Sequence, residues 1–275
     1  MDGDLPSDWN HDPETRITMR LERVRRAMAD ADYVSAMIEA EELLDESPNH
    51  AEGLFLLAES MLELGDAEGA AEVYAHHLQL VGSDIPSLIG LSIARFSTCD
   101  IPGAVQAARE AVRLAPDNAE AHYHLGLALE RQPNRRSEAV SALAAANQLD
   151  PEHYYYPLDL SDSMWHTALE LALSRLHPAI QRFWADVEVV LEDLPSLAEL
   201  RRVDPPITPI VPGLYEGAPP VGVDPWTVRP DALRLFRGNL ARAATFDDVV
   251  DALVRTLDHE ALDWLGLELE DLAEL

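Results

Sequence analysis

The sequence predicts an α-helical solenoid followed by a small α+β domain, and three observations support this fold class. Apolar and small residues recur at a fixed interval through the first half of the chain. This periodicity stops at Pro151, and short alternating apolar stretches follow it. A long amphipathic helix pattern then lies near the carboxyl end.

The repeating unit is clearest between Ala119 and Pro151, where it contains the pair Leu125-Gly126 and closes with proline. A pair of helices with small residues at their contacts explains this pattern. Earlier units, stepping back by about 34 residues, match at Leu88, Leu91, Ala104, Ala108, Ala111 and Pro116, then at Leu54, Leu57, Ala58, Ala70 and Tyr74. A first, divergent unit matches at Ala36, Ala40, Leu43 and Pro48, and its Arg-rich helix at residues 18–29 is typical of a terminal capping repeat.

These residues resemble the tetratricopeptide-repeat (TPR) family over residues 17–151. The resemblance implies a TPR array at 17–154, preceded by a flexible N-terminus at 1–16, with a concave groove that binds a protein or peptide. By the same resemblance the groove is lined by Phe55, Leu62, Ile89, Ile93, Phe96, Tyr123 and Leu127, with acidic residues such as Glu59 and Glu63 beside them. We expect an apolar or basic partner; alternatively, neighbouring elements cover some of these side chains and they bind nothing.

The net charge of −30 limits the range of partners. The 275 residues include 50 acidic and 20 basic ones, all of the latter arginine. Such a chain disfavours nucleic-acid and membrane binding, although genomic bias or a salty cytoplasm would give the same composition. The single cysteine, Cys99, predicts a reducing, cytoplasmic location. We expect no secretory signal and no membrane span.

The second domain is expected at 160–275, after a boundary at 155–161. A helix is predicted over 162–184 and strands over 186–191 and 232–237. Between them, residues 204–230 hold eight of the 19 prolines, which predicts an extended surface segment. Thr245 with Asp248 and Gly266 are the capping residues expected at the two ends of the last helix.

Within that last helix, His259, Glu260 and Asp263 have a spacing that suits metal chemistry. In the pattern His-Glu-x-x-His, two histidines one turn apart bind zinc and the glutamate is the general base. Here Asp263 stands in place of the second histidine. The two candidate metal ligands are therefore His259 and Asp263, and Glu260 is the candidate catalytic base. Alternatively, His259 and Asp263 form a surface hydrogen bond, and Glu260 needs a donor such as Arg237 or Tyr215.

Two further segments accompany this helix. They are Gly213-Leu214-Tyr215-Glu216-Gly217 and Leu235-Phe236-Arg237-Gly238-Asn239-Leu240. Together the three segments resemble a bacterial family of zincin-like metallopeptidases over about 160–272. The resemblance implies a third metal ligand at the position of Leu269, which cannot bind a metal. Glu268, Glu270 or Asp271 would have to replace it.

We therefore predict an interaction or scaffold protein that carries a degenerate metallopeptidase-like domain and has no cofactor. The alternative is a Zn²⁺-dependent metallopeptidase whose repeat array selects protein substrates.

Overall fold

The structure is a computed structural model that describes residues 12–268, 270 and 271. The chain forms two compact units, Met1–Tyr154 and Tyr155–Leu275. Each unit buries apolar side chains of its own.

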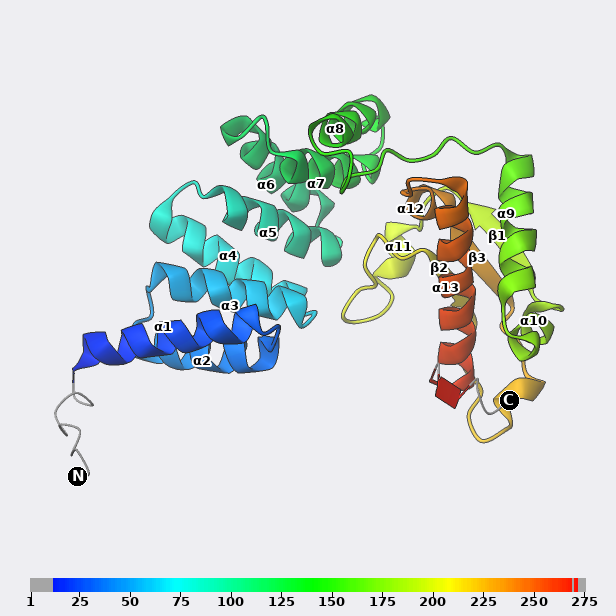
Figure 1. The fold of residues 1–275 in the computed structure, drawn as a ribbon, viewed down its shortest axis with the longest axis horizontal. Coiled ribbons are helices and arrows are strands. Elements are labelled where there is room, and N and C mark those ends of the chain that lie inside the picture. The colour runs from blue at the N-terminus through cyan, green and yellow to red at the C-terminus, as the bar shows by residue number, and fades with distance from the viewer. Residues whose placement is uncertain (1–11, 269, 272–275) are drawn as a thin grey trace, which may run out of the picture. The chain divides into compact units, whose positions relative to one another are not determined.

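Within the described residues of the first unit, every regular element is a helix, and consecutive helices form antiparallel pairs (Figure 1). The first helices of successive pairs, α1, α3, α5 and α7, contact one another in turn. This arrangement confirms the predicted repeat solenoid. The helices are α1 (Pro13–Ala29), α2 (Tyr33–Glu46), α3 (Ala51–Glu63), α4 (Ala67–Val81), α5 (Ile85–Ser97), α6 (Ile101–Leu114), α7 (Ala119–Glu130) and α8 (Arg136–Leu149).

Small residues allow the helices of this unit to approach closely. The alanines of the repeating pattern have no exposed surface at Ala36, Ala40, Ala58, Ala70, Ala104, Ala108, Ala111, Ala139 and Ala146. At Gly126 a Cβ atom would lie 2.6 Å from Cγ of Leu143, so only glycine fits there without a shift. The sequence pattern is thus a packing pattern.

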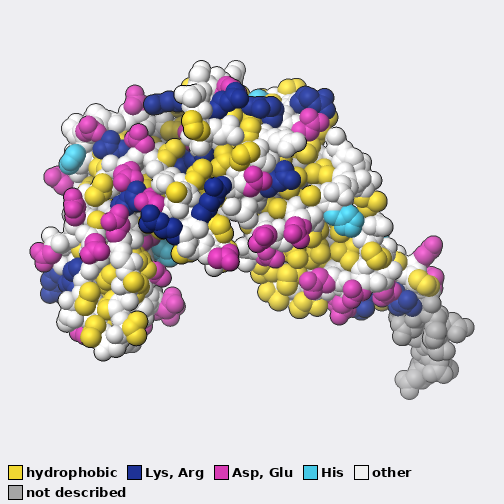
Figure 2. Space-filling model, turned by 180° about the vertical axis from the view of Figure 1, so that it is seen from behind, with side chains coloured by type: hydrophobic (Ala, Val, Ile, Leu, Met, Phe, Trp, Pro, Cys, Tyr) yellow, Lys and Arg dark blue, Asp and Glu magenta, His cyan; other side chains and the backbone are white. Residues whose placement is uncertain are grey.

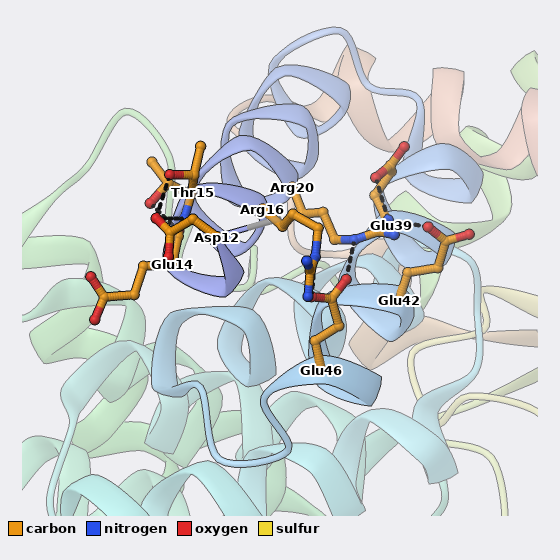
Figure 3. A network of polar contacts seen from close by, with 9 residues as sticks. Asp12, Glu14, Thr15, Arg16, Arg20, Glu39, Glu42 and Glu46 are labelled. Carbon is orange, nitrogen blue, oxygen red and sulfur yellow. Dashed lines mark hydrogen bonds and ion pairs between the residues drawn. The ribbon is translucent and has the colours of Figure 1, made fainter. Parts of the chain in front are cut away.

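The first helix pair is held together by ion pairs as well as by apolar contacts (Figure 3). The Arg20 guanidinium lies 3.4 Å from Glu39 and 3.3 Å from Glu46, and it also contacts Glu42. Arg16 binds Glu46 at 3.0 Å. Two arginines of the divergent first helix thus bind carboxylates of α2.

The array begins earlier than predicted. We expected helical structure from Ile17, but α1 begins at Pro13, and the Asp12 carboxylate accepts a hydrogen bond from the Thr15 N–H. Proline suits the first turn of a helix, because N–H groups there have no acceptor within the helix and proline therefore loses no hydrogen bond. The predicted flexible residues 1–11 lie outside the described part of the chain.

The second unit combines helices with a small mixed sheet. Its elements are α9 (Asp162–Arg175), α10 (Pro178–Trp184), β1 (Glu188–Glu192), α11 (Leu197–Leu200), β2 (Gly213–Glu216), the 3-10 turn η2 (Pro225–Thr227), β3 (Ala232–Phe236), α12 (Arg237–Leu240) and α13 (Phe246–Leu265). The strand order is β1-β3-β2, with β1 parallel and β2 antiparallel to β3. Helix α13 packs against α9 and β2, and its apolar stripe belongs to the core.

Two predictions in this unit need correction. The helix expected over 162–184 is two helices, because Pro178 starts α10 and His177 caps it by accepting the Ala179 N–H at 3.3 Å. The Pro-rich segment 204–230 is not extended throughout, since it contains the 3-10 turn η2, and part of its extended backbone forms the edge strand β2. Its prolines confine β2 to the edge of the sheet, where a strand tolerates neighbouring prolines.

Carboxylates are spread over the face of the molecule drawn in Figure 2, with arginines between them. Among the described residues, no helix has both the length and the apolar character needed to cross a membrane.

Candidate functional site

Helix α13 positions the three candidate residues His259, Glu260 and Asp263. It begins with a capping box between Thr245 and Asp248, and it ends at Gly266, whose φ of 65° is readily adopted by glycine. Both predicted caps are therefore present. The apolar residues on the core side of the helix fix its rotation, and with it the direction of each candidate side chain.

The three candidate residues have different environments. His259 and Asp263 are exposed, whereas Glu260 is only 6% exposed. The expected pair of metal ligands thus faces solvent, and the expected base lies against the protein interior. No hydrogen bond joins His259 to Asp263 among the described residues.

Tyr215 of β2 contacts both carboxylates of this site. Its N–H donates to Oε2 of Glu260 at 3.1 Å, and its hydroxyl donates to Oδ2 of Asp263 at 2.6 Å. Its ring packs edge-on against Trp264, with 5.2 Å between the ring centroids. One residue therefore contacts three positions in the last turns of α13.

Burial raises the pKa of Glu260, the hydrogen bond from Tyr215 opposes this rise and the charge of Asp263 adds to it, so that the pKa is about 7. Burial and the bond to Asp263 also raise the pKa of the Tyr215 hydroxyl. A carboxyl group that titrates near neutral pH is suited to proton transfer.

The donor set does not fit a catalytic zinc ion. Such an ion needs three protein ligands and an open position, and this helix supplies one imidazole and one carboxylate. Among the described residues, no three His, Cys, Asp or Glu side chains are grouped so that they could hold a metal ion. Glu268, Glu270 and Asp271 are exposed and complete no such group. Leu269 lies outside the described residues.

Arginines of the second unit have other roles. Arg237, a predicted donor for Glu260, instead binds Asp162 at 2.7 Å. Arg234 of β3 binds Glu192, Glu199 and Glu216, at 2.8 Å for Glu199. We had not predicted this network, although a charged residue within the apolar strand Ala232–Phe236 was the signal for it.

The seven predicted groove residues differ in accessibility. Phe55, Leu62, Ile93 and Tyr123 are half-buried, while Ile89, Phe96 and Leu127 are at most 5% exposed. Ile89 packs with Leu88, Ala111 and Ala121 in the array core. Whether any of the seven binds a partner stays a prediction.

A cluster of carboxylates lies on the same first helices. Glu59 and Glu63 belong to α3 and Glu120 to α7, and all three charges act on the buried Tyr74, whose hydroxyl donates to Glu59. Burial raises the pKa of Glu120, and the charge of Glu59 adds to this rise. We call Glu59, Glu63 and Glu120 the acidic cluster. The sequence had indicated Glu59 and Glu63 but not Glu120.

Comparison with known families agrees with both halves of this description. Residues 96–132 match the model of the TPR repeat, and residues 184–275 match the model of the zincin-like metallopeptidase. The chain therefore combines a TPR region with a zincin-like metallopeptidase domain, which confirms both resemblances.

Several solved structures, TPR proteins among them, are similar to this chain at low sequence identity. A MamA protein is 21% identical over 50% of this chain and 74% of its own, with a TM-score of 0.47. YrrB, described as a TPR protein with an unusual peptide-binding site, is 16% identical over 60% and 79%, with a TM-score of 0.45. A thermophilic TPR protein from Thermus thermophilus is 23% identical over 49% and 75%, with a TM-score of 0.43. Among curated proteins, no sequence matches the chain.

Proposed function

We propose that this protein is an interaction scaffold whose TPR array binds a basic segment of another protein and whose zincin-like unit has lost peptidase activity. The observation that carries the proposal is the acidic cluster. The single cysteine, Cys99, supports a reducing compartment such as the cytoplasm.

The acidic cluster combines the partial burial of Glu59 and Glu120 with the absence, among the described residues, of an arginine partner. Among the described residues, no ion pair reaches Glu59, Glu63 or Glu120, although many other carboxylates of the array bind arginine. Glu59 and Glu120 are half-buried, Glu63 is exposed, and the charge of Glu59 raises the pKa of Glu120. A ligand with positive charge is favoured here, because its charge relieves both this repulsion and the desolvation. Lysine or arginine side chains of a partner would supply this charge.

The zincin-like unit supports the second part of the proposal. His259 and Asp263 provide two ligands, and Leu269 replaces the third. An ion bound by only two side chains would dissociate readily into the solvent, so it would not be available to polarise a peptide bond.

The partner preference is tested with fluorescent peptides of equal length that are basic, apolar or acidic. Fluorescence anisotropy with the full-length protein should detect binding of the basic peptide. Combining Glu59→Gln with Glu120→Gln should weaken this binding about tenfold or more, since hydrogen bonds to charged groups contribute about 1.5–3 kcal/mol each. The control is Glu72→Gln, which changes an exposed carboxylate of α4. Equal binding of the apolar peptide, or no effect of the double variant, would refute the proposed preference.

A second candidate function is a peptidase, and the pKa of Glu260 near 7 favours it. Under this alternative His259 and Asp263 would hold the ion and Glu260 would be the base. Cleavage of casein and of the basic peptide is measured with added Zn²⁺ for the native protein and for Glu260→Gln. The scaffold proposal expects equal background rates, and zinc-dependent cleavage lost in Glu260→Gln would establish the peptidase.

A further inference from the structure

Strand β2 lies at the edge of the sheet, with β3 on one side only, and it packs against α13. The two elements approach closely: a Cβ atom on Gly213 would lie 2.7 Å from Cγ2 of Thr256. The Tyr215 N–H points away from β3 and would be unpaired at this edge without Glu260. Glu260 therefore supplies the acceptor for an edge N–H at this contact.

In a zincin-like domain a bound ion would stabilise the carboxylates at this point of α13, and among the described residues the ligands for such an ion are incomplete. Like charges at Glu260 and Asp263 repel each other, and they lie near the negative end of the helix dipole. Hydrogen-bond donors can compensate for part of this cost without a cation.

We infer that Tyr215 takes the place of the metal ion: its N–H on Glu260 and its hydroxyl on Asp263 hold β2 against α13, so the unit is folded and stable without metal. We call these two hydrogen bonds the Tyr215 bridge. The inference rests on the proposed loss of metal chemistry, but it does not involve the TPR groove.

The geometry explains why one residue is sufficient. Positions 260, 263 and 264 are three and four residues apart, so they lie on one face of α13. The Tyr215 backbone reaches the first, its hydroxyl reaches the second, and its ring covers the third. Phenylalanine at this position keeps the backbone bond and the ring contact and removes only the hydroxyl bond.

A double-mutant cycle tests the bridge on the full-length protein. Four of the five tryptophans lie in residues 155–275, so tryptophan fluorescence follows the unfolding of this unit. Tyr215→Phe should lower the thermal midpoint by about 3–5 °C in the native background and by nothing in the Asp263→Ala background. Tyr156→Phe is the matched control, because Tyr156 is exposed and makes no hydrogen bond among the described residues.

Metal dependence is tested on the same samples. The midpoints of the native protein and of His259→Ala are measured with Zn²⁺ and with a chelator. We expect Zn²⁺ to change the thermal midpoints of both proteins by the same amount, since nonspecific binding of the ion to an acidic surface does not depend on His259.

Two results would overturn the inference. One is an equal effect of Tyr215→Phe with and without Asp263, which would show that the hydroxyl does not act through this carboxylate. The other is a zinc-dependent rise of the midpoint that is larger in the native protein than in His259→Ala. Neither result depends on peptide binding by the groove, so the scaffold proposal is tested separately.

Discussion

At the scale of the residue, adjacent positions of α13 have opposite environments. His259 is exposed, whereas Glu260 is buried and accepts the N–H of Tyr215. A motif in the sequence specifies the order of these side chains but not their solvation, and solvation determines their chemistry. A buried carboxyl with one donor can serve as a proton acceptor or as a structural acceptor.

The first prediction concerns the pH dependence caused by Glu260. Its pKa is about 7 in the folded protein against a usual value of 4.5, so the folded state binds more protons between these values. The stabilisation that neutral Glu260 gives the folded state is fully present below about pH 4.5 and is lost as the pH rises through 7. Glu260→Gln keeps an oxygen for the Tyr215 N–H and removes the titration.

We therefore expect Glu260→Gln to be more stable than the native protein at pH 8, by roughly 2–3 kcal/mol, and about equal to it near pH 5. Urea unfolding followed by tryptophan fluorescence at pH 5, 6.5 and 8 measures the difference. Profiles that stay parallel across this range would contradict the prediction.

At the scale of the element, the repeating helices were predictable because their contacts are periodic. Each alanine of the pattern meets a neighbouring helix at the same place in every unit. Contacts without a period were not predictable in this way: Tyr215 bonds to residues 45 and 48 positions away, and Arg234 binds carboxylates from three separate segments.

Errors in the predicted elements have local causes. The apolar stripe continues from Trp165 to Phe183, so it hid the break that Pro178 makes between α9 and α10. Strand β2 was missed because prolines surround it, although an edge strand tolerates them.

The second prediction concerns the close contact of α7 with α8. Gly126→Ala should destabilise the array by about 1–3 kcal/mol, because the added methyl overlaps the Leu143 side chain. The gain in helix propensity, about 1 kcal/mol, offsets only part of this. Far-UV circular dichroism of the full-length protein in urea measures the change.

Leu143→Ala is the test of the cause, since it removes the atoms that an alanine at 126 would meet. In that background Gly126→Ala should be neutral or stabilising. The same loss in both backgrounds would mean that Leu143 is not the obstacle.

The third prediction concerns the ion pairs between α1 and α2. The Arg20 side chain is 24% exposed and meets three carboxylates, so Arg20→Gln should lower the stability of the array by about 1 kcal/mol at low salt and by less in about 0.5 M NaCl. Arg26→Gln is the control: Arg26 is 86% exposed and lies 3.9 Å from Asp30. Circular dichroism should show no change for the control, and a similar loss in both variants would contradict the prediction.

At the scale of the whole molecule, charge connects the sequence to the proposed partner. The net charge of −30 attracts a basic segment at long range, and the acidic cluster provides carboxylates at short range. Composition alone predicted the first effect. The second could not be derived from it, because Glu59 and Glu120 belong to helices separated by a full helix pair and only the fold brings their charges together.

The last prediction separates these two effects. Binding of the basic peptide should weaken as NaCl rises from about 50 to 300 mM, mainly through slower association, because salt screens long-range attraction over about 10 Å at 0.1 M. Glu59→Gln combined with Glu120→Gln should mainly raise the dissociation rate and leave the salt dependence of association nearly unchanged, since the net charge changes by only two units out of 30. Stopped-flow fluorescence measures both rates. If the double variant instead slowed association and left dissociation unaltered, the acidic cluster would act only as part of the overall charge, and the peptide would lie elsewhere on the surface.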